Sequence, residues 1–410
     1  MNNYKEVILD NGLTMYLYQD KTKNRCIASI YILAGGKDTT FYIDNEEKHV
    51  LSGTAHFLEH YLLEHSIYGN AMELFKDEYV NSNGATSSFE TNYYISTVHD
   101  FKELYIKLLN IVNNPVFDEK AIDLTRKPII SEIDRKNDDK YIGYYKTLNN
   151  AIYKNDLYNI TLGDKQDILN MDVNNLKLFH EAFYQASNQV IVITGNFDDD
   201  IVNLTKEIYS SFKQSNLNVK KKELNETSHV KNSYVEYKKD IKDPYVTIAY
   251  KFDISNLTPV EKNKLDFYLS YIDTSNFSME SNLYQELVNN KIINFSIDYN
   301  ISVIENILVL KISNVTNNDE FIARVKSQIN NLVFNEEIFK RWKNRTIINR
   351  INKLDKLSFK ENNFITNLLN YNYKVFDSLE FIKSLNLDEC KMMINNLDFN
   401  NFTVVKNSVE

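Results

Sequence analysis

The chain has 410 residues, 43% of them hydrophobic, and a formal net charge of −9, so two or three globular domains are expected. Its acidic and basic residues are interspersed without a strong basic patch, which argues against nucleic acid as the main partner. We find no membrane-length apolar run, no secretory signal, and no redox or metal spacing between Cys26 and Cys390, and this combination favours a cytoplasmic protein.

The first half of the chain shows strand patterns, then helical patterns, then one more strand. Asp10, Asn11 and Gly12 form a hairpin-turn signal between two strands. The apolar positions Leu104, Leu108 and Ile111 have the spacing of an amphipathic helix. The predicted strands are 5–9, 13–18, 26–33, 82–87, 93–98 and 189–194, and the predicted helices are 51–64, 101–112, 122–134 and 173–183.

Hydrophobicity drops between about residues 214 and 232, and this polar stretch reads as an interdomain linker. The second half then repeats the α+β order of the first, which suggests an internal duplication. We therefore predict an N-terminal domain at 1–215, a linker at 216–232 and a similar C-terminal domain at 233–410. The predicted strands there are 234–238, 245–250, 293–299 and 307–312, with helices at 260–271, 283–289 and from 319 onward.

The segment TAHFLEHYLLEH holds three of the seven histidines of the chain. A helix advances about 100° per residue, so His56 and His60 point the same way and Glu59 lies beside them. His65 falls roughly 180° from His56 and cannot join that group on an unbroken helix. Glu64 lies a turn further on and is interpreted as a surface acid.

The H-x-x-E-H spacing fits zinc chemistry. Two neutral imidazoles bind zinc, a third protein ligand completes the set, and one position stays open for water. A carboxylate beside the metal, here Glu59, would act as a base and not as a ligand. The alternative is a helix with a solvated polar face. Most of this helix is apolar, however, and a buried helix would not leave two histidines and a glutamate without partners.

The third ligand should be an acid or a histidine on another element. Glu132, in RKPIISEIDRK, is a candidate because isoleucines surround it on a predicted helix. It could equally be a surface acid, like Asp134 and Asp138 nearby. The residues alone leave both interpretations open.

Several segments together resemble the pitrilysin family of metallopeptidases, which includes insulysin and the mitochondrial processing peptidase. In chain order they are DNGLTMYLYQD, GTAHFLEHYLLEHS, NGATSSFETNYY, IISEID and FYQASNQVIVITGNF. They span the N-terminal half, and the second half is similar only in outline. The resemblance implies an α+β fold of two duplicated domains, each a mostly antiparallel sheet with helices packed on it, that form half of a clamshell chamber.

Residue by residue, the resemblance implies one zinc ion in the N-terminal domain, held by two histidines and a glutamate, with a second glutamate as general base. These positions are His56, His60, Glu132 and Glu59. It also implies an edge strand that binds peptide substrate by β-addition through Asn83, Gly84 and Ala85. The alternative for Asn83 is a turn residue before Gly84.

Near the implied site the chain departs from the family pattern at three positions. Thr125 stands where the family usually has a second glutamate, which puts catalytic support from that acid in doubt. Pro128 suits a first helical turn, so the helix that carries Glu132 is expected to start later than in relatives. Gly84 replaces the usual alanine, a milder change.

A further departure lies in the second half. Val288 and Phe295 match a family arginine and tyrosine that hold the substrate carbonyl, and neither can donate a hydrogen bond. No arginine occurs from Asn276 to Tyr299. The resemblance therefore implies a heterodimer in which a second homologous chain supplies these donors, with a homodimer as the lesser version.

The function implied is that of a zinc-dependent metalloendopeptidase subunit that hydrolyses peptides or unfolded precursor segments. The alternative is a non-catalytic subunit that binds peptides or acts as a scaffold. The intact H-x-x-E-H and Glu132 favour the enzyme. Thr125, Val288 and Phe295 keep the alternative open.

Overall fold

The computed structural model describes residues 4–158, 160–213, 215, 217–238, 244–316 and 319–407. The chain divides into two compact units, Met1–Asp139 with Leu157–Leu224, and Lys140–Asp156 with Asn225–Glu410. The predicted division at 1–215 and 233–410 differs, because Lys140–Asp156 belongs to the second unit and the later boundary falls inside the predicted linker. Position 216 of that linker and the chain ends, 1–3 and 408–410, lie outside the described residues.

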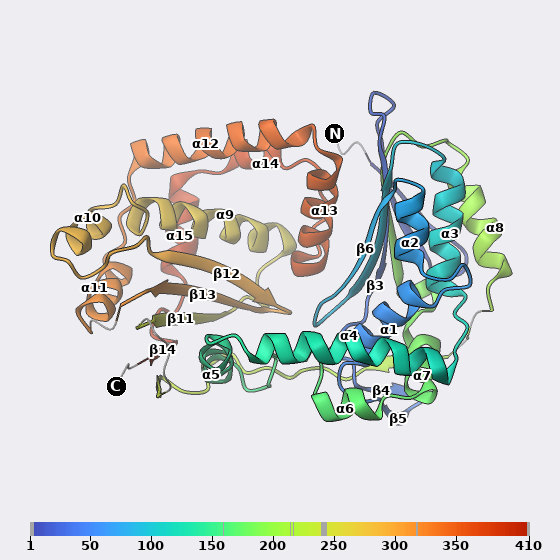
Figure 1. Ribbon diagram of the computed structural model, residues 1–410. Coiled ribbons are helices and arrows are strands. Elements are labelled where there is room, and N and C mark those ends of the chain that lie inside the picture. The colour runs from blue at the N-terminus through green and yellow to red at the C-terminus, as the bar shows by residue number, and fades with distance from the viewer. Residues whose placement is uncertain are drawn as a thin grey trace. The chain divides into compact units, whose positions relative to one another are not determined.

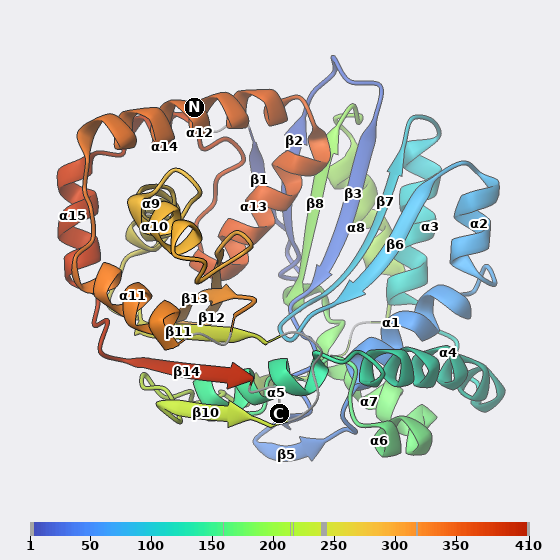
Figure 2. The same ribbon diagram turned by 60° about the vertical axis from the view of Figure 1, so that its left-hand side comes forward.

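The first unit is built on a six-stranded sheet in the order β1-β2-β8-β3-β7-β6. Neighbouring strands are antiparallel except β2 and β8, which are parallel. Helices α1, α2, α3 and α8 lie along one face of this sheet (Figures 1 and 2). The strands are β1 (Lys5–Ile8), β2 (Thr14–Gln19), β3 (Cys26–Ile32), β6 (Asn81–Thr86), β7 (Thr91–Thr97) and β8 (Gln189–Gly195).

The helices of this unit are α1 (Thr54–Glu64), α2 (Ala71–Asp77), α3 (Phe101–Asn113), α4 (Glu119–Asn137), α6 (Lys165–Asn170), α7 (Val173–Phe183), the short 3-10 helix at Ala186–Asn188, and α8 (Ile201–Ser211). A small sheet in the order β5-β4-β9 adds β4 (Thr40–Ile43), β5 (Glu46–His49) and β9 (Val219–Lys221). Because β9 pairs with β4, part of the predicted linker is a strand of the first unit.

The second unit has a five-stranded sheet in the order β10-β14-β11-β13-β12. Its first pair is parallel and its other pairs are antiparallel. The run β2-β8-β3-β7-β6 has the same succession of pair types, so the two halves share one topology and the predicted duplicated α+β fold is confirmed. The strands are β10 (Tyr234–Tyr237), β11 (Val246–Asp253), β12 (Asp298–Ile304), β13 (Ile307–Asn314) and β14 (Phe402–Asn407).

Strand β11 explains why helices cover both faces of the second sheet. Side chains alternate along a strand, and Ile248 and Tyr250 pack into the apolar core that α9 completes. On the other face, the Tyr144 hydroxyl of α5 donates a hydrogen bond to Thr247 Oγ1 (2.9 Å). The helices of this unit are α5 (Ile142–Ile152), α9 (Pro259–Asn276), α10 (Asn282–Asn289), α11 (Asp319–Asn330), α12 (Glu336–Leu354), α13 (Leu357–Tyr371), α14 (Leu379–Ser384) and α15 (Leu387–Asn395).

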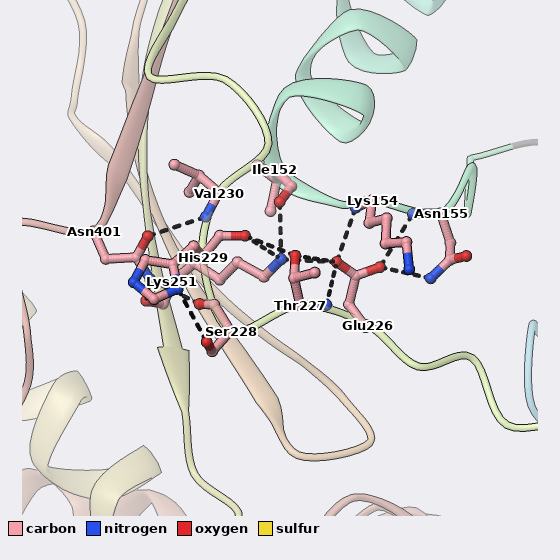
Figure 3. A network of polar contacts seen from close by, with 10 residues as sticks. All are labelled: Ile152, Lys154, Asn155, Glu226, Thr227, Ser228, His229, Val230, Lys251 and Asn401. Carbon is pink, nitrogen blue, oxygen red and sulfur yellow. Dashed lines mark hydrogen bonds and ion pairs between the residues drawn. The ribbon is translucent and has the colours of Figure 1, made fainter.

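A buried ion pair lets β11 run past its predicted end at residue 250. The side chain of Lys251 is 0% exposed, and its Nζ donates to Glu226 Oε1 at 2.8 Å and to the carbonyls of Ile152 and His229 at 3.0 Å (Figure 3). The other donors to Glu226 include the Lys154 amide (2.8 Å) and the Asn155 side chain (2.8 Å).

Glu226 lies in the predicted linker, so that assignment is wrong for this part of 216–232. This polar stretch is not simply a solvated linker, because its Glu226 supplies the counter-charge for Lys251 inside the sheet. Burial alone would raise the pKa of Glu226, but the Lys154 amide, Lys251 and Asn155 together lower it to about 2. Its contribution to stability is therefore present above the ordinary pKa of 4.5 and is lost as pH falls toward about 2.

Replacing Lys251 with methionine is expected to lower the free energy of unfolding by about 3–5 kcal/mol, because a buried carboxylate loses its counter-ion. Urea unfolding followed by circular dichroism measures the loss. Lys383→Met is the matched control, since Lys383 pairs with Glu380 on an exposed helix surface and such pairs contribute about 0–1 kcal/mol. Equal losses in the two variants would contradict a stabilising role for the buried pair.

Two other predicted boundaries are wrong. The strand predicted at 293–299 is β12 at Asp298–Ile304, because Ile293 and Ile297 are buried in the apolar core without strand pairing. Helix α4 starts at Glu119 and contains Pro128 in its interior, so the expected late start does not occur. Pro128 and Leu124, whose carbonyl loses its helical donor there, are both exposed.

No helix in the described part of the chain combines the length and apolarity that crossing a bilayer requires.

Candidate metal centre

Helix α1 carries both histidines of the H-x-x-E-H segment, with His56 buried and His60 partly buried. It begins after Gly53, whose φ of 79° favours glycine. A Cβ there would lie 2.6 Å from the carbonyl oxygen of Leu162. His56 and Glu59 are only 7% and 6% exposed, so the prediction of a largely buried helix is confirmed.

Helix α4 packs against α1 and brings Glu132 to the two histidines. The Nε2 atoms of His56 and His60 lie 3.6 Å and 3.8 Å from the same Glu132 oxygen, Oε2. Within the described residues, these three form the one group of His, Cys, Asp or Glu side chains whose candidate ligand atoms all lie within 4.8 Å of one another. Glu132, whose side chain is 34% exposed, therefore lies beside both histidines, as the candidate third ligand must.

The spacing of the three donor atoms fits a shared metal ion. Two ligands of a tetrahedral zinc, each about 2.1 Å from it, lie roughly 3.4 Å apart. The two histidine–Glu132 separations, 3.6 Å and 3.8 Å, are slightly longer than that value and too long for good hydrogen bonds. Two imidazoles and one carboxylate are also the donor set of a catalytic zinc site with one open position.

The surroundings shift the pKa values of the two histidines in opposite directions. Burial lowers the pKa of His56 to about 3, with help from the charges of His60 and Lys136, so this imidazole is neutral at physiological pH. Burial also lowers the pKa of His60, but the Glu64 hydrogen bond and nearby carboxylates outweigh it and the net shift is upward. A metal ion must displace a proton from a charged histidine, so metal affinity at this site is expected to fall as pH falls.

Glu59 lies beside the histidines with its carboxylate held against β6. Burial is the largest cause of its raised pKa, and the Thr86 hydroxyl donates a hydrogen bond to its Oε2 (3.0 Å). A Cβ on Gly84 would come within 2.5 Å of Oε1 of Glu59. The glycine found in place of the expected alanine therefore makes room for this carboxylate.

A cleft of about 610 Å3 opens over these side chains. Asn83, Gly84 and Ala85 line it from β6, which is the edge strand of the first sheet. Asn83 lies within β6 and pairs with Tyr94 of the neighbouring strand β7, so the interpretation of Asn83 as a turn residue is wrong. The other lining residues are His56, Glu59, His60, Leu63, Glu64, Met72, Thr86, Glu132, Lys136, Thr161 and Leu162.

Sequence reasoning missed or misjudged three residues here. Glu64 is not a surface acid, because it is 27% exposed and its Oε1 lies 3.3 Å from Nδ1 of His60. Its spacing of four residues from His60 could have shown this contact. Lys136 lines the cleft, and its charge helps to lower the pKa of His56. Its spacing of four residues from Glu132 could have placed it near the site. The role of Thr86 could not be predicted from local sequence spacing, because its contact with Glu59 joins strand β6 to helix α1.

The remaining departures have plain structural outcomes. Thr125 is buried in α4, and its hydroxyl donates to the carbonyl of Ala121 (3.1 Å). Val288 and Phe295 belong to the second unit and are both exposed. Exposed apolar side chains at these two positions offer no hydrogen-bond donor to a ligand.

The fold and the site together define a class of protein: an α+β chain of two like halves, with an H-x-x-E-H helix and a second glutamate, Glu132, beside a cleft. Residues 15–165 match the family described as Insulinase (Peptidase family M16), and residues 170–346 match the Peptidase M16 inactive domain. The chain therefore belongs to peptidase family M16, the pitrilysin family, and the resemblance seen in the sequence is confirmed.

Individual relatives agree with this assignment. The chain is 27% identical over 252 residues to YmfH, an uncharacterized zinc protease of Bacillus subtilis (strain 168), covering 59% of this chain and 58% of YmfH. The chain spans about half the length of the curated relatives it matches.

Two solved structures share the fold over nearly the whole chain. An M16-like peptidase from Alicyclobacillus acidocaldarius superposes with a TM-score of 0.86 at 21% identity, covering 99% of this chain and 98% of that one. A protease from Helicobacter pylori gives 0.81 at 19% identity, with 100% of both chains covered. At these identities the likeness shows the fold alone.

Proposed function

We propose that this chain is the zinc-bearing subunit of a metalloendopeptidase. The observation that carries the proposal is the convergence of both Nε2 atoms on the Glu132 carboxylate, next to buried Glu59 and in an open cleft. His56, His60 and Glu132 would hold one zinc ion. When bound, zinc would polarise a peptide carbonyl and lower the pKa of a water molecule in the cleft.

Glu59 would act as the general base. Its buried carboxylate has a raised pKa, which makes it a better proton acceptor near neutral pH than an exposed glutamate. The Thr86 hydroxyl bonds Oε2 and fixes the orientation of the group. Glu59 would take the proton of the attacking water and deliver it to the leaving amine nitrogen.

Peptide or unfolded polypeptide is the proposed substrate. The edge strand β6 carries Asn83, Gly84 and Ala85 along the cleft, and an extended peptide can add to such an edge through main-chain hydrogen bonds. Because these bonds do not depend on side chains, we expect broad sequence tolerance. A folded protein presents no free extended segment, so precursor or unfolded segments are the favoured class.

A partner chain is proposed to complete the site within a closed chamber. Val288 and Phe295 cannot donate hydrogen bonds to a substrate oxyanion. A second copy of this chain would carry the same two residues, so a heterodimer with a homologous chain is favoured over a homodimer. We place the complex in the cytoplasm, since both Cys26 and Cys390 are buried free thiols.

The second candidate is a non-catalytic subunit that binds peptides or acts as a scaffold. Val288 and Phe295 favour it, as does the match of residues 170–346 to a domain described as inactive. The test is to isolate the tagged chain from its own cells with bound partners and to assay cleavage of unfolded polypeptides. The enzyme predicts cleavage that a zinc chelator abolishes and added zinc restores. Peptide binding without any cleavage would contradict it.

A further inference from the structure

His60 contacts acids through both of its ring nitrogens. Its Nε2 lies 3.8 Å from Oε2 of Glu132, on the side of the candidate metal centre. Its Nδ1 lies 3.3 Å from Oε1 of Glu64, within hydrogen-bond distance. Glu64 is not in the group of candidate metal ligands. Its Oε1 contacts the side of the His60 ring that faces away from that group, and its Oε2 lies 3.9 Å from Nε2 of His65.

This geometry constrains the proton position on His60. An ionised carboxylate can accept hydrogen bonds but cannot donate them. The contact between Glu64 and His60 therefore requires the proton to be on Nδ1 of His60. A neutral imidazole with its proton on Nδ1 has its lone pair on Nε2, where a metal ion would bind. A carboxylate that accepts from the second nitrogen also raises the basicity of the ligand.

We propose that Glu64 is a positioning residue that holds His60 as the Nδ1–H tautomer with Nε2 directed at the metal centre. The inference rests on the proposed zinc site. It adds a role for a residue outside the H-x-x-E-H segment and Glu132.

The surroundings of the two histidines support this assignment. The Nδ1 atom of His56 is buried and has no hydrogen-bond partner among the described residues. Of the two histidines, only His60 therefore has an acid within hydrogen-bond distance of its Nδ1. Thr125 offers a hydroxyl and no carboxylate, and that hydroxyl donates to the carbonyl of Ala121. The other acids near His60 are Glu59 and Glu132, and Glu132 faces its Nε2.

The local structure also suits Glu64 to this role. It is the last residue of α1 and lies one turn beyond His60, so the helix itself fixes the approach of the two side chains. Both are partly buried, at 26% and 27% exposed. A contact shielded in this way is less weakened by solvent than a surface pair.

The test measures zinc affinity of the full chain by competition with a chromophoric chelator. Glu64→Ala is expected to weaken zinc binding by about 10–100-fold, the usual effect of losing such a partner. Glu64→Gln, whose amide oxygen can still accept the Nδ1–H bond, should recover part of that loss. Glu207→Ala, which removes an exposed glutamate of α8 in the same unit, should leave the affinity unchanged.

A second readout does not depend on metal. Nitrogen-15 NMR of histidine-labelled, metal-free chain at a pH where His60 is neutral should show its proton on Nδ1. In Glu64→Ala the proton should move to Nε2 or be divided between the two neutral tautomers. An Nε2–H tautomer in the unsubstituted chain, or equal zinc affinity in Glu64→Ala, would overturn the inference. If the unsubstituted chain binds no zinc at all, the proposed function fails, and the tautomer alone then decides the role of Glu64.

Discussion

Replacing Glu59 with glutamine is expected to abolish peptide hydrolysis by the native complex while zinc stays bound. Glutamine has the same shape and can still accept the hydrogen bond from Thr86, but it cannot take a proton from water. Loss of general acid–base catalysis lowers rates by about 10²–10⁴-fold. The measurement is kcat on an unfolded polypeptide, with the zinc content of the same preparation determined in parallel.

The control for this variant is Glu207→Gln, which changes an exposed glutamate of the same unit by the same chemistry. It should hydrolyse at the unsubstituted rate. Retained zinc with lost turnover assigns Glu59 to proton transfer and not to metal binding. Hydrolysis that survives Glu59→Gln would rule out the proposed mechanism.

Replacing Glu132 with alanine is expected to lower zinc affinity by more than the roughly 100-fold upper range for an orienting residue. The reason is that Glu132 would contribute a ligand atom itself, with its Oε2 close to both histidine Nε2 atoms. Its removal leaves two imidazoles, fewer than the three protein ligands of a catalytic zinc site. Competition with a chromophoric chelator measures the change.

Asp134→Ala is the matched control on the same helix. Asp134 is exposed and pairs with Lys165, so its loss should leave zinc affinity unchanged. The expected order of affinities is therefore Asp134→Ala, then Glu64→Ala, then Glu132→Ala as the weakest. Equal affinities for Glu132→Ala and Asp134→Ala would mean that Glu132 is not a ligand.

The part of the site that lies on one helix could be predicted from the sequence. Angular spacing alone put His56, Glu59 and His60 on neighbouring positions of one helical face, because helix geometry is local. Glu132 could not be chosen in this way, since its approach depends on how α4 packs against α1. Only the family resemblance selected it from among other acids.

Some errors of sequence reasoning come from partners that are distant in the chain. The predicted strand stopped at residue 250, just before Lys251. A lysine inside a sheet is costly unless it is paired, and its buried partner Glu226 lay in a stretch that looked like a linker. Pro128 was expected near a helix start, but an exposed proline is tolerated within α4. The duplicated fold was predictable in outline because both halves repeat one order of strands and helices.

The most direct test of the central claim is the zinc content of the purified chain, measured by elemental analysis after zinc resupply and removal of unbound metal. The account predicts about one zinc per chain, as a site of three protein ligands requires, and its loss in His56→Ala. A chain that holds no zinc after resupply would contradict the account, and the cleft would then belong to a peptide-binding or scaffolding subunit.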